Sequence, residues 1–244
     1  DELDKQKYLF SKLMSWLKSN GASFPSLDIK HYNERFRGVV LTEDVVKGKE
    51  ILIIPDKCIM SNLKAYMSES GTELLKSEFK SYSYSLPLSL FLLEEKMKFD
   101  SFWQPYIDIL PTSYDNFPLF YTEELKQLKG SFVVEVILSK KLALEEEFKN
   151  VQKYLPVFGQ KITFDEYRWA TIAIRSRSYN VTMDKIINDI IIVPMADMFN
   201  HANDPSARWI FNDEKNSFVV TSDTLMKTGN EVFESYGMKS NSQF

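Results

Sequence analysis

The chain changes its secondary-structure character twice along its length. Short apolar runs that are typical of strands occur within residues 39–54 and again after residue 189. Between them, residues 61–178 have the apolar spacing of helices, including a predicted helix over residues 125–154. Strands near both ends with a long helical stretch between them predict an α+β fold and exclude a repeating βαβ series. A Rossmann cofactor fold is also excluded, because no Gly-x-Gly-x-x-Gly turn follows the first strand.

Local signals place individual elements within this outline. Apolar residues at helical spacing within residues 10–17, followed by Gly21, predict a helix that stops near that glycine. Thr163 and Glu166 predict a capping box, because each side chain can satisfy a free backbone N–H of the other residue. The polar run at residues 212–216 predicts a hairpin loop between two strands.

Composition and charge exclude several classes of protein. With 44% hydrophobic and 26% charged residues among 244, the chain can bury a core and is not disordered throughout. Its net charge of -4 argues against nucleic-acid binding by bulk charge, and its apolar runs are too short to span a membrane. A single cysteine, Cys58, cannot form an internal disulfide or a cysteine zinc site, and we expect a reducing compartment, the cytosol or the nucleus.

The two histidines, His31 and His201, limit the chemistry that is available. No His, Asp and Glu group has metal-ligand spacing, so no metal site is predicted. A Ser-His-Asp hydrolase would need His201, but no Gly-x-Ser-x-Gly elbow is present.

Three polar stretches remain as candidates for a site: residues 194–205, 229–241 and 33–40. The first brings Asp, Asn and His together directly after an apolar strand, where polar groups need partners. Taken singly, each stretch is also consistent with a plain structural role: a polar turn with a satisfied histidine, a core tyrosine with a solvated hydroxyl, or a charged turn.

Taken together and in this order, the three stretches resemble the SET-domain methyltransferases. The Arg35 to Gly38 stretch resembles the family's N-terminal strand and turn. The Asn200-His201 pair with Asp204-Pro205 resembles its Asn-His-x-x-x-Pro motif, and Glu231 to Gly237 resembles its closing Glu-x-x-x-x-Tyr-Gly motif. The stretches 101–107, 110–111, 114–115 and 167–170 are similar to the branch that contains the Rubisco large-subunit lysine methyltransferase and the actin-histidine methyltransferase.

This resemblance implies a SET-domain fold of short strands with a knot-like closure, interrupted by a long helical insert. Residues 1–60 would hold the N-terminal helix and the first part of the SET domain, residues 61–185 the insert, and residues 186–244 the C-terminal part. Relatives continue with a segment that closes the adenine pocket and with a helical lobe that helps to hold the protein substrate. We expect this chain to lack both.

The resemblance also implies the cofactor, S-adenosylmethionine, and residues for each role. Tyr236 is expected at the methyl-transfer channel as the catalytic residue, together with Tyr179 and Ala196 as channel walls. The expected cofactor-binding residues are Arg35, Phe36, Arg37, Gly38, Arg177, Asp197, Asn200 and His201. The family usually has a glycine at the position of Phe36, so the approach of the cofactor to the backbone is expected to differ there.

The acceptor residue is the point on which the branch divides. Histidine-acting relatives have a tryptophan at the position of Ala196 and an amide side chain at the position of Tyr179. A small residue and an aromatic wall suit the methylene stem of a lysine, so we predict a protein-lysine N-methyltransferase whose partner is a protein that presents a lysine. The alternatives are a protein-histidine N-methyltransferase and a non-catalytic SET-like binding module.

Overall fold

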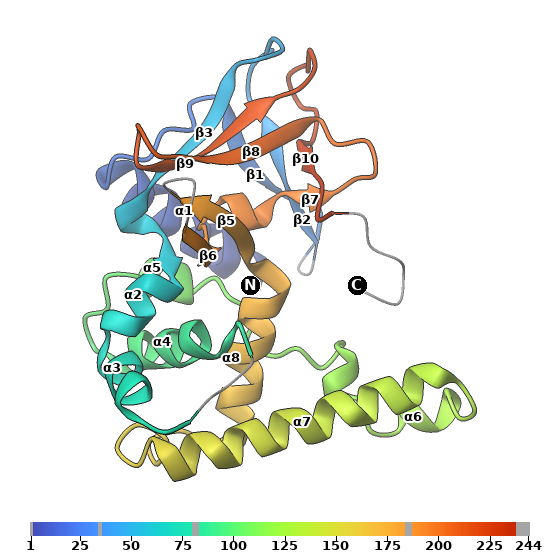
Figure 1. Cartoon of the computed structure of the whole chain (residues 1–244). Coiled ribbons are helices and arrows are strands. Elements are labelled where there is room, and N and C mark those ends of the chain that lie inside the picture. The colour runs from blue at the N-terminus through green and yellow to red at the C-terminus, as the bar shows by residue number, and fades with distance from the viewer. Residues whose placement is uncertain (1, 34–35, 80–82, 184–186, 238–244) are drawn as a thin grey trace. The chain divides into compact units, whose positions relative to one another are not determined.

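The computed structural model describes residues 2–33, 36–79, 83–183 and 187–237 (Figure 1). Its helices are α1 Glu2–Ser19, α2 Asn62–Met67, α3 Glu69–Lys76, α4 Leu86–Met97, α5 Gln104–Ile107, α6 Glu124–Gln127, α7 Phe132–Tyr154 and α8 Phe164–Arg177, with short 3-10 turns η1 Asp56–Cys58, η2 Pro118–Phe120 and η3 Ala196–Met198. Its strands are β1 Leu27–His31, β2 Arg37–Leu41, β3 Glu50–Pro55, β4 Met60–Ser61, β5 Tyr179–Met183, β6 Ile187–Ile192, β7 Asn200–His201, β8 Ala207–Asn212, β9 Ser217–Ser222 and β10 Phe233–Glu234.

The chain forms two compact units. A β-rich unit contains residues 1–61, 102–109 and 178–244, and a helical unit contains residues 62–101 and 110–177. The division predicted from the sequence, with boundaries after residues 60 and 185, stays a prediction. By compactness, the segment with α5 belongs to the β-rich unit although it lies inside the predicted insert.

Strands from distant parts of the chain pair in the β-rich unit. The antiparallel sheet β3-β9-β8 joins a strand from the first quarter of the chain to two strands from its last fifth, with Ile54 opposite Phe218 (Figure 1). A second sheet has the order β4-β6-β5, and β1 pairs with β2. The predicted hairpin loop at residues 212–216 is confirmed, because Asn212 and Ser217 are paired at the ends of β8 and β9.

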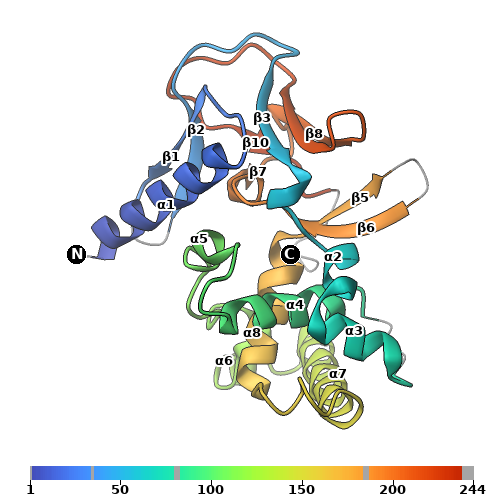
Figure 2. The same ribbon diagram turned by 90° about the vertical axis from the view of Figure 1, so that its left-hand side faces the viewer.

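The core of this unit follows from the apolar patterns in its sequence. Helix α1 buries Phe10, Leu13 and Leu17, which confirms the helix predicted over residues 10–17. The ring of Phe10 lies 5.2 Å from that of His31, so α1 packs against β1, as the view in Figure 2 also shows. Strand β9 buries residues on both of its faces, as expected for the central strand of a covered sheet.

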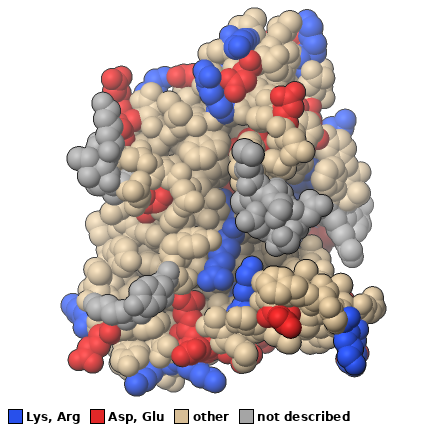
Figure 3. Space-filling view, turned by 45° about the vertical axis from the view of Figure 1, so that its right-hand side comes forward, with Lys and Arg blue, Asp and Glu red and all other residues tan. Residues whose placement is uncertain are grey.

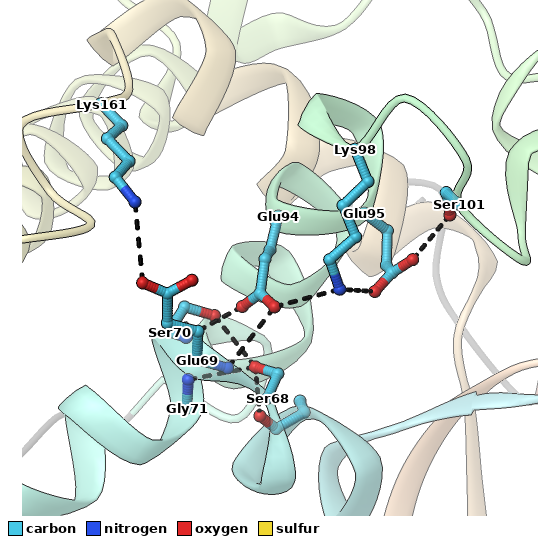
Figure 4. Close-up of polar contacts among 10 residues, drawn as sticks. Ser68, Glu69, Ser70, Gly71, Glu94, Glu95, Lys98, Ser101 and Lys161 are labelled. Atoms are coloured by element: carbon cyan, nitrogen blue, oxygen red, sulfur yellow. Dashed lines mark hydrogen bonds and ion pairs between the residues drawn. The ribbon is translucent and has the colours of Figure 1, made fainter.

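The helical unit is organised around α4, which is buried on most of its circumference and packs against α3 and α8. Two carboxylates near the C-terminal end of α4 are buried and have hydrogen-bond and ion-pair partners (Figure 4). Glu94 accepts a hydrogen bond from the backbone N–H of Ser70 at 2.8 Å, and Glu95 accepts one from the hydroxyl of Ser101 at 2.6 Å. Lys98 forms ion pairs with both carboxylates. These acids therefore fasten α3 and the segment after α4 to the helix.

Two predictions within the helical unit have different outcomes. The capping box is confirmed: Thr163 N donates to Glu166 Oε2 at 2.8 Å, and Glu166 N donates to Thr163 Oγ1 at 3.3 Å. The single helix predicted over residues 125–154 is wrong, because Gly130 has a φ of 87° and separates α6 from α7. The hydroxyl of Ser131 then caps α7, and this Gly-Ser pair is the signal that a pattern based on apolar spacing overlooked.

Four further observations concern the described residues. None of their helices combines the length and the apolar character that a membrane crossing requires. They contain no group of three or more His, Cys, Asp or Glu side chains that could hold a metal ion. On the face in Figure 3, basic and acidic side chains both occur, and most of the coloured surface carries neither. The side chain of Cys58 is buried.

Candidate active site

The described residues of the three polar stretches lie together in the β-rich unit. Strands β7 and β10 are paired in parallel, with His201 opposite Glu234 (Figure 1). Strand β2 meets the segment before β10 through a bridge between Val40 and Glu231 and through a 2.8 Å hydrogen bond from Val232 N to the carbonyl oxygen of Val39. Segments more than 190 residues apart in sequence therefore form one backbone framework.

The side chain of Asn200 forms hydrogen bonds to two of the segments in this framework. Its Nδ2 donates to the carbonyl oxygen of Arg37 at 2.9 Å and to Glu231 Oε1 at 2.6 Å. The other carboxylate oxygen of Glu231 accepts from the hydroxyl of Tyr32 at 2.7 Å. A Cβ atom at position 38 would collide with the Glu231 carboxylate, so the carboxylate can keep this position beside Asn200 only because residue 38 is a glycine.

The predicted cofactor residues of the first stretch lie in different environments. Arg37 directs Nη2 at the sulfur of Met198, 3.2 Å away, and its guanidinium lies 4.8 Å from the ring centre of Phe10. Phe36 is 53% exposed. Arg35 lies outside the described residues, so its predicted contact stays a prediction.

His201 and Tyr236 form a second pair within the site. His201 Nδ1 accepts from the backbone N–H of Tyr236 at 3.0 Å, and the two rings lie 5.2 Å apart. The hydroxyl of Tyr236 donates to the carbonyl oxygen of Phe199 at 2.6 Å. Tyr236 is 40% exposed, so it is not the core tyrosine that its sequence context alone also allowed. Its hydroxyl is therefore oriented by the protein.

Asp197 and Ala196 lie in the 3-10 turn η3, before β7. The turn follows Met195, a buried residue with a φ of 75°. A residue other than glycine in this region costs on the order of 1–3 kcal/mol, and such strain is concentrated at functional sites. Asp197 Oδ2 accepts from the hydroxyl of Tyr106 at 2.7 Å, and Ala196 is fully buried.

Tyr179 and Glu234 form a buried polar pair. The hydroxyl of Tyr179 donates to Glu234 Oε1 at 2.7 Å, while its ring packs against Trp209 and Phe218. Glu234 is only 2% exposed. Burial raises the pKa of Glu234 to about 8; the Tyr179 hydrogen bond opposes this change and the nearby charge of Asp197 adds to it. Burial, and then the charge of Glu234, also raises the pKa of Tyr179 well above its ordinary value.

Arg177 is the last residue of α8 and belongs to the helical unit. It lies two residues before Tyr179 in the sequence. Its predicted contact with the carboxylate of the cofactor stays a prediction.

Reasoning from the sequence missed four residues that structure this site: Tyr32, Tyr106, Glu231 and Glu234. Glu231 and Tyr106 lie inside stretches that the sequence had already singled out, so their positions were visible but their roles were not. Glu234 also lies inside one of these stretches, residues 229–241, two positions before Tyr236, but nothing in the sequence indicated that its carboxyl group is buried.

Comparison with known proteins places this site in a family. The SET domain model matches residues 37–237. Curated relatives include the actin-histidine N-methyltransferases of Xenopus tropicalis, 27% identical over 251 residues, and of Callithrix jacchus, 26% identical over 250 residues. Both alignments cover 98% of this chain but only 43% and 42% of those relatives. The chain thus spans about two-fifths of the length of the curated relatives that it matches.

A solved structure agrees with these matches. The SET domain of LSMT bound to lysine and AdoHcy superposes with a TM-score of 0.80 at 25% sequence identity, over 96% of this chain and 54% of that chain. The predicted α+β SET fold is confirmed by this likeness. Because the family model spans most of the sequence and includes residues of all three polar stretches, the chain belongs to the SET-domain family.

Proposed function

We propose that the chain is the catalytic domain of an S-adenosylmethionine-dependent protein methyltransferase whose acceptor is a histidine side chain. Membership of the SET-domain family supports the reaction class, and the AdoHcy in the related LSMT structure is the donor after loss of its methyl group. The chain retains the side chains at the motif positions Asn200, His201 and Tyr236, which weighs against a binding module without activity.

The residues of the site fit this cofactor. The exposed ring of Phe36 offers a face for an adenine base, and the guanidinium of the half-buried Arg37 suits a carboxylate. Asn200 holds the backbone around them in place through Arg37 and Glu231. When bound, S-adenosylmethionine supplies a methyl group attached to a sulfonium.

Tyr236 would act at the transfer step. Its hydroxyl is held by the carbonyl oxygen of Phe199, and its backbone N–H is held by His201. The hydroxyl and neighbouring carbonyl oxygens can accept weak C–H···O contacts from a polarised methyl group. Such fixed positions contribute through proximity and orientation.

The single observation that favours histidine is the Tyr179–Glu234 pair. The prediction of a lysine acceptor expected Tyr179 to offer an apolar wall, but its hydroxyl is bonded to a buried carboxyl group. A neutral imidazole has one nitrogen that attacks and one N–H that needs an acceptor, and this pair supplies a carboxyl oxygen. The names of the curated relatives, actin-histidine N-methyltransferases, support the same choice.

Lysine is the second candidate. The small side chain of Ala196 leaves room where histidine-acting relatives have a tryptophan, and the related LSMT structure has lysine bound. The predicted lysine specificity and the predicted location in the cytoplasm or nucleus stay predictions.

The test is methyl transfer from isotope-labelled S-adenosylmethionine to purified actin and to proteins of a cell lysate. Acid hydrolysis and mass spectrometry then identify the methylated amino acid, with Tyr236→Phe as the control for transfer by this site. Labelled methylhistidine is expected. Methyllysine alone would establish the second candidate, and cofactor binding without any transfer would establish the binding module.

A further inference from the structure

Glu234 is a buried carboxyl group with one oxygen engaged and one not. Oε1 accepts from the hydroxyl of Tyr179, whereas Oε2 is inaccessible to solvent and has no hydrogen-bond partner among the described residues. No described Lys, Arg or His forms an ion pair with it. A buried polar atom without a partner costs about 1–3 kcal/mol, so natural proteins retain few of them, and each one asks for a functional explanation.

The place of Glu234 in the fold supplies that explanation. It is the last residue of β10, paired with His201 of β7 and two residues before Tyr236. Its other close neighbour, Tyr179, was predicted as a wall of the acceptor channel. The carboxyl group is therefore bonded to a residue assigned to the acceptor channel and lies two residues before the one assigned to the transfer step.

We infer that Glu234 is a further catalytic residue, which accepts the N–H of the acceptor imidazole through Oε2 and takes up its proton after methyl transfer. This inference rests on the proposed histidine methyltransferase activity. Tyr179 is then a positioning residue, because its hydrogen bond leaves only Oε2 of the carboxyl group for the acceptor.

The reaction balances as follows. The unprotonated imidazole nitrogen forms a bond to the methyl carbon while the bond between that carbon and the sulfonium sulfur breaks. The positive charge of the sulfonium passes to the imidazole ring. The proton on the other ring nitrogen then moves to Glu234 Oε2, which leaves neutral methylhistidine and a neutral carboxylic acid. The pKa of Glu234, about 8, exceeds the value of about 6.5 for an ordinary histidine, so this direction of proton transfer is favourable.

The required starting form of Glu234 is the carboxylate, so the reaction should become faster as the pH rises towards 8. The titratable and charged groups on the elements around it are Tyr179 on β5, Asp197 on η3, His201 on β7 and Arg208 on β8. Arg208 is exposed, and Asp197 opposes ionisation of Glu234. The acceptor imidazole must also be unprotonated, and its ordinary pKa of about 6.5 accounts for the rise below about pH 7. The rise from about pH 7 to 8 therefore belongs chiefly to Glu234.

The decisive experiment compares the wild-type protein with Glu234→Gln, using purified actin and lysate proteins as acceptors and methylhistidine as the readout. The glutamine keeps the size of the side chain and an oxygen for Tyr179 but cannot take up a proton. We expect kcat to fall by about 100-fold or more, the Kd for S-adenosylmethionine to stay unchanged in calorimetry, and the rise in kcat/KM towards pH 8 to disappear. Glu234→Asp should recover part of the lost turnover. Glu50→Gln, at an exposed ion pair with Lys215, should behave as wild type.

Each outcome bears on one claim. Wild type and Glu234→Gln producing methylhistidine at equal rates would overturn this inference and leave the proposed function intact. Equal losses of cofactor affinity and turnover would assign Glu234 a structural role and also overturn the inference. Failure of the wild type to produce methylhistidine while it binds the cofactor would overturn the proposed function, and this inference with it.

Discussion

Replacing Glu234 with glutamine should change how the stability of the protein depends on pH, whatever the acceptor is. The folded-state pKa of Glu234, about 8, lies above its ordinary value of 4.5 because the carboxyl group is buried. Between these two pH values the unfolded chain releases the proton and the folded chain keeps it. The unfolded state then binds fewer protons than the folded state, so the free energy of unfolding falls as the pH rises through this interval.

The size of the effect follows from the width of the interval. At about 1.4 kcal/mol for each pH unit, the interval from 4.5 to about 8 corresponds to about 5 kcal/mol for complete ionisation. This is comparable with the whole stability of many domains. Glutamine cannot ionise, so the variant should match the wild type near pH 5 within about 1–3 kcal/mol, the cost of one buried unpaired polar group. It should be more stable than the wild type by a few kcal/mol at pH 8.

Urea denaturation of both proteins between pH 5 and 9, analysed by linear extrapolation, measures this difference directly. Glu50→Gln is the matched control, because its exposed ion pair with Lys215 contributes about 0–1 kcal/mol. Parallel stability curves for the wild type and Glu234→Gln across this range would refute the reasoning, since they would mean that Glu234 titrates alike in the folded and unfolded chains.

Four further outcomes follow from the site and the fold. Tyr236→Phe should lower turnover by on the order of 100-fold while leaving the Kd for S-adenosylmethionine within about threefold; an equal loss of both would contradict its assignment to the transfer step. Asn200→Ala removes two hydrogen bonds and should lower the free energy of unfolding by about 2 kcal/mol, together with cofactor affinity, as measured by denaturation and calorimetry. Gly38→Ala should destabilise the protein by about 1–3 kcal/mol, because its Cβ atom meets the Glu231 carboxylate, and an unchanged melting temperature would argue against that contact. Thr163→Ala should cost about 1 kcal/mol through loss of the capping box, with no change in methyl transfer.

The amino-acid sequence by itself was enough for the local elements and for the family of the fold. The apolar face of α1 and the capping box at Thr163 depend on neighbouring residues, so spacing and residue type predict them correctly. The same reasoning failed at Gly130, where a single backbone conformation outweighed the apolar spacing around it. The three polar stretches were visible as motifs, and their order along the chain was sufficient to predict the SET fold.

The contacts between the residues of those motifs are determined only by the tertiary structure. The parallel pairing of β7 with β10 and the contact between Gly38 and Glu231 join segments that no local pattern connects. Glu234 shows the reason most clearly. An acidic residue in a two-residue strand would normally be assigned to the surface, yet it is buried against Tyr179, more than 50 residues away in sequence. Burial, hydrogen bonding and pKa depend on the atoms that the fold brings around a side chain, and those atoms come from distant parts of the chain.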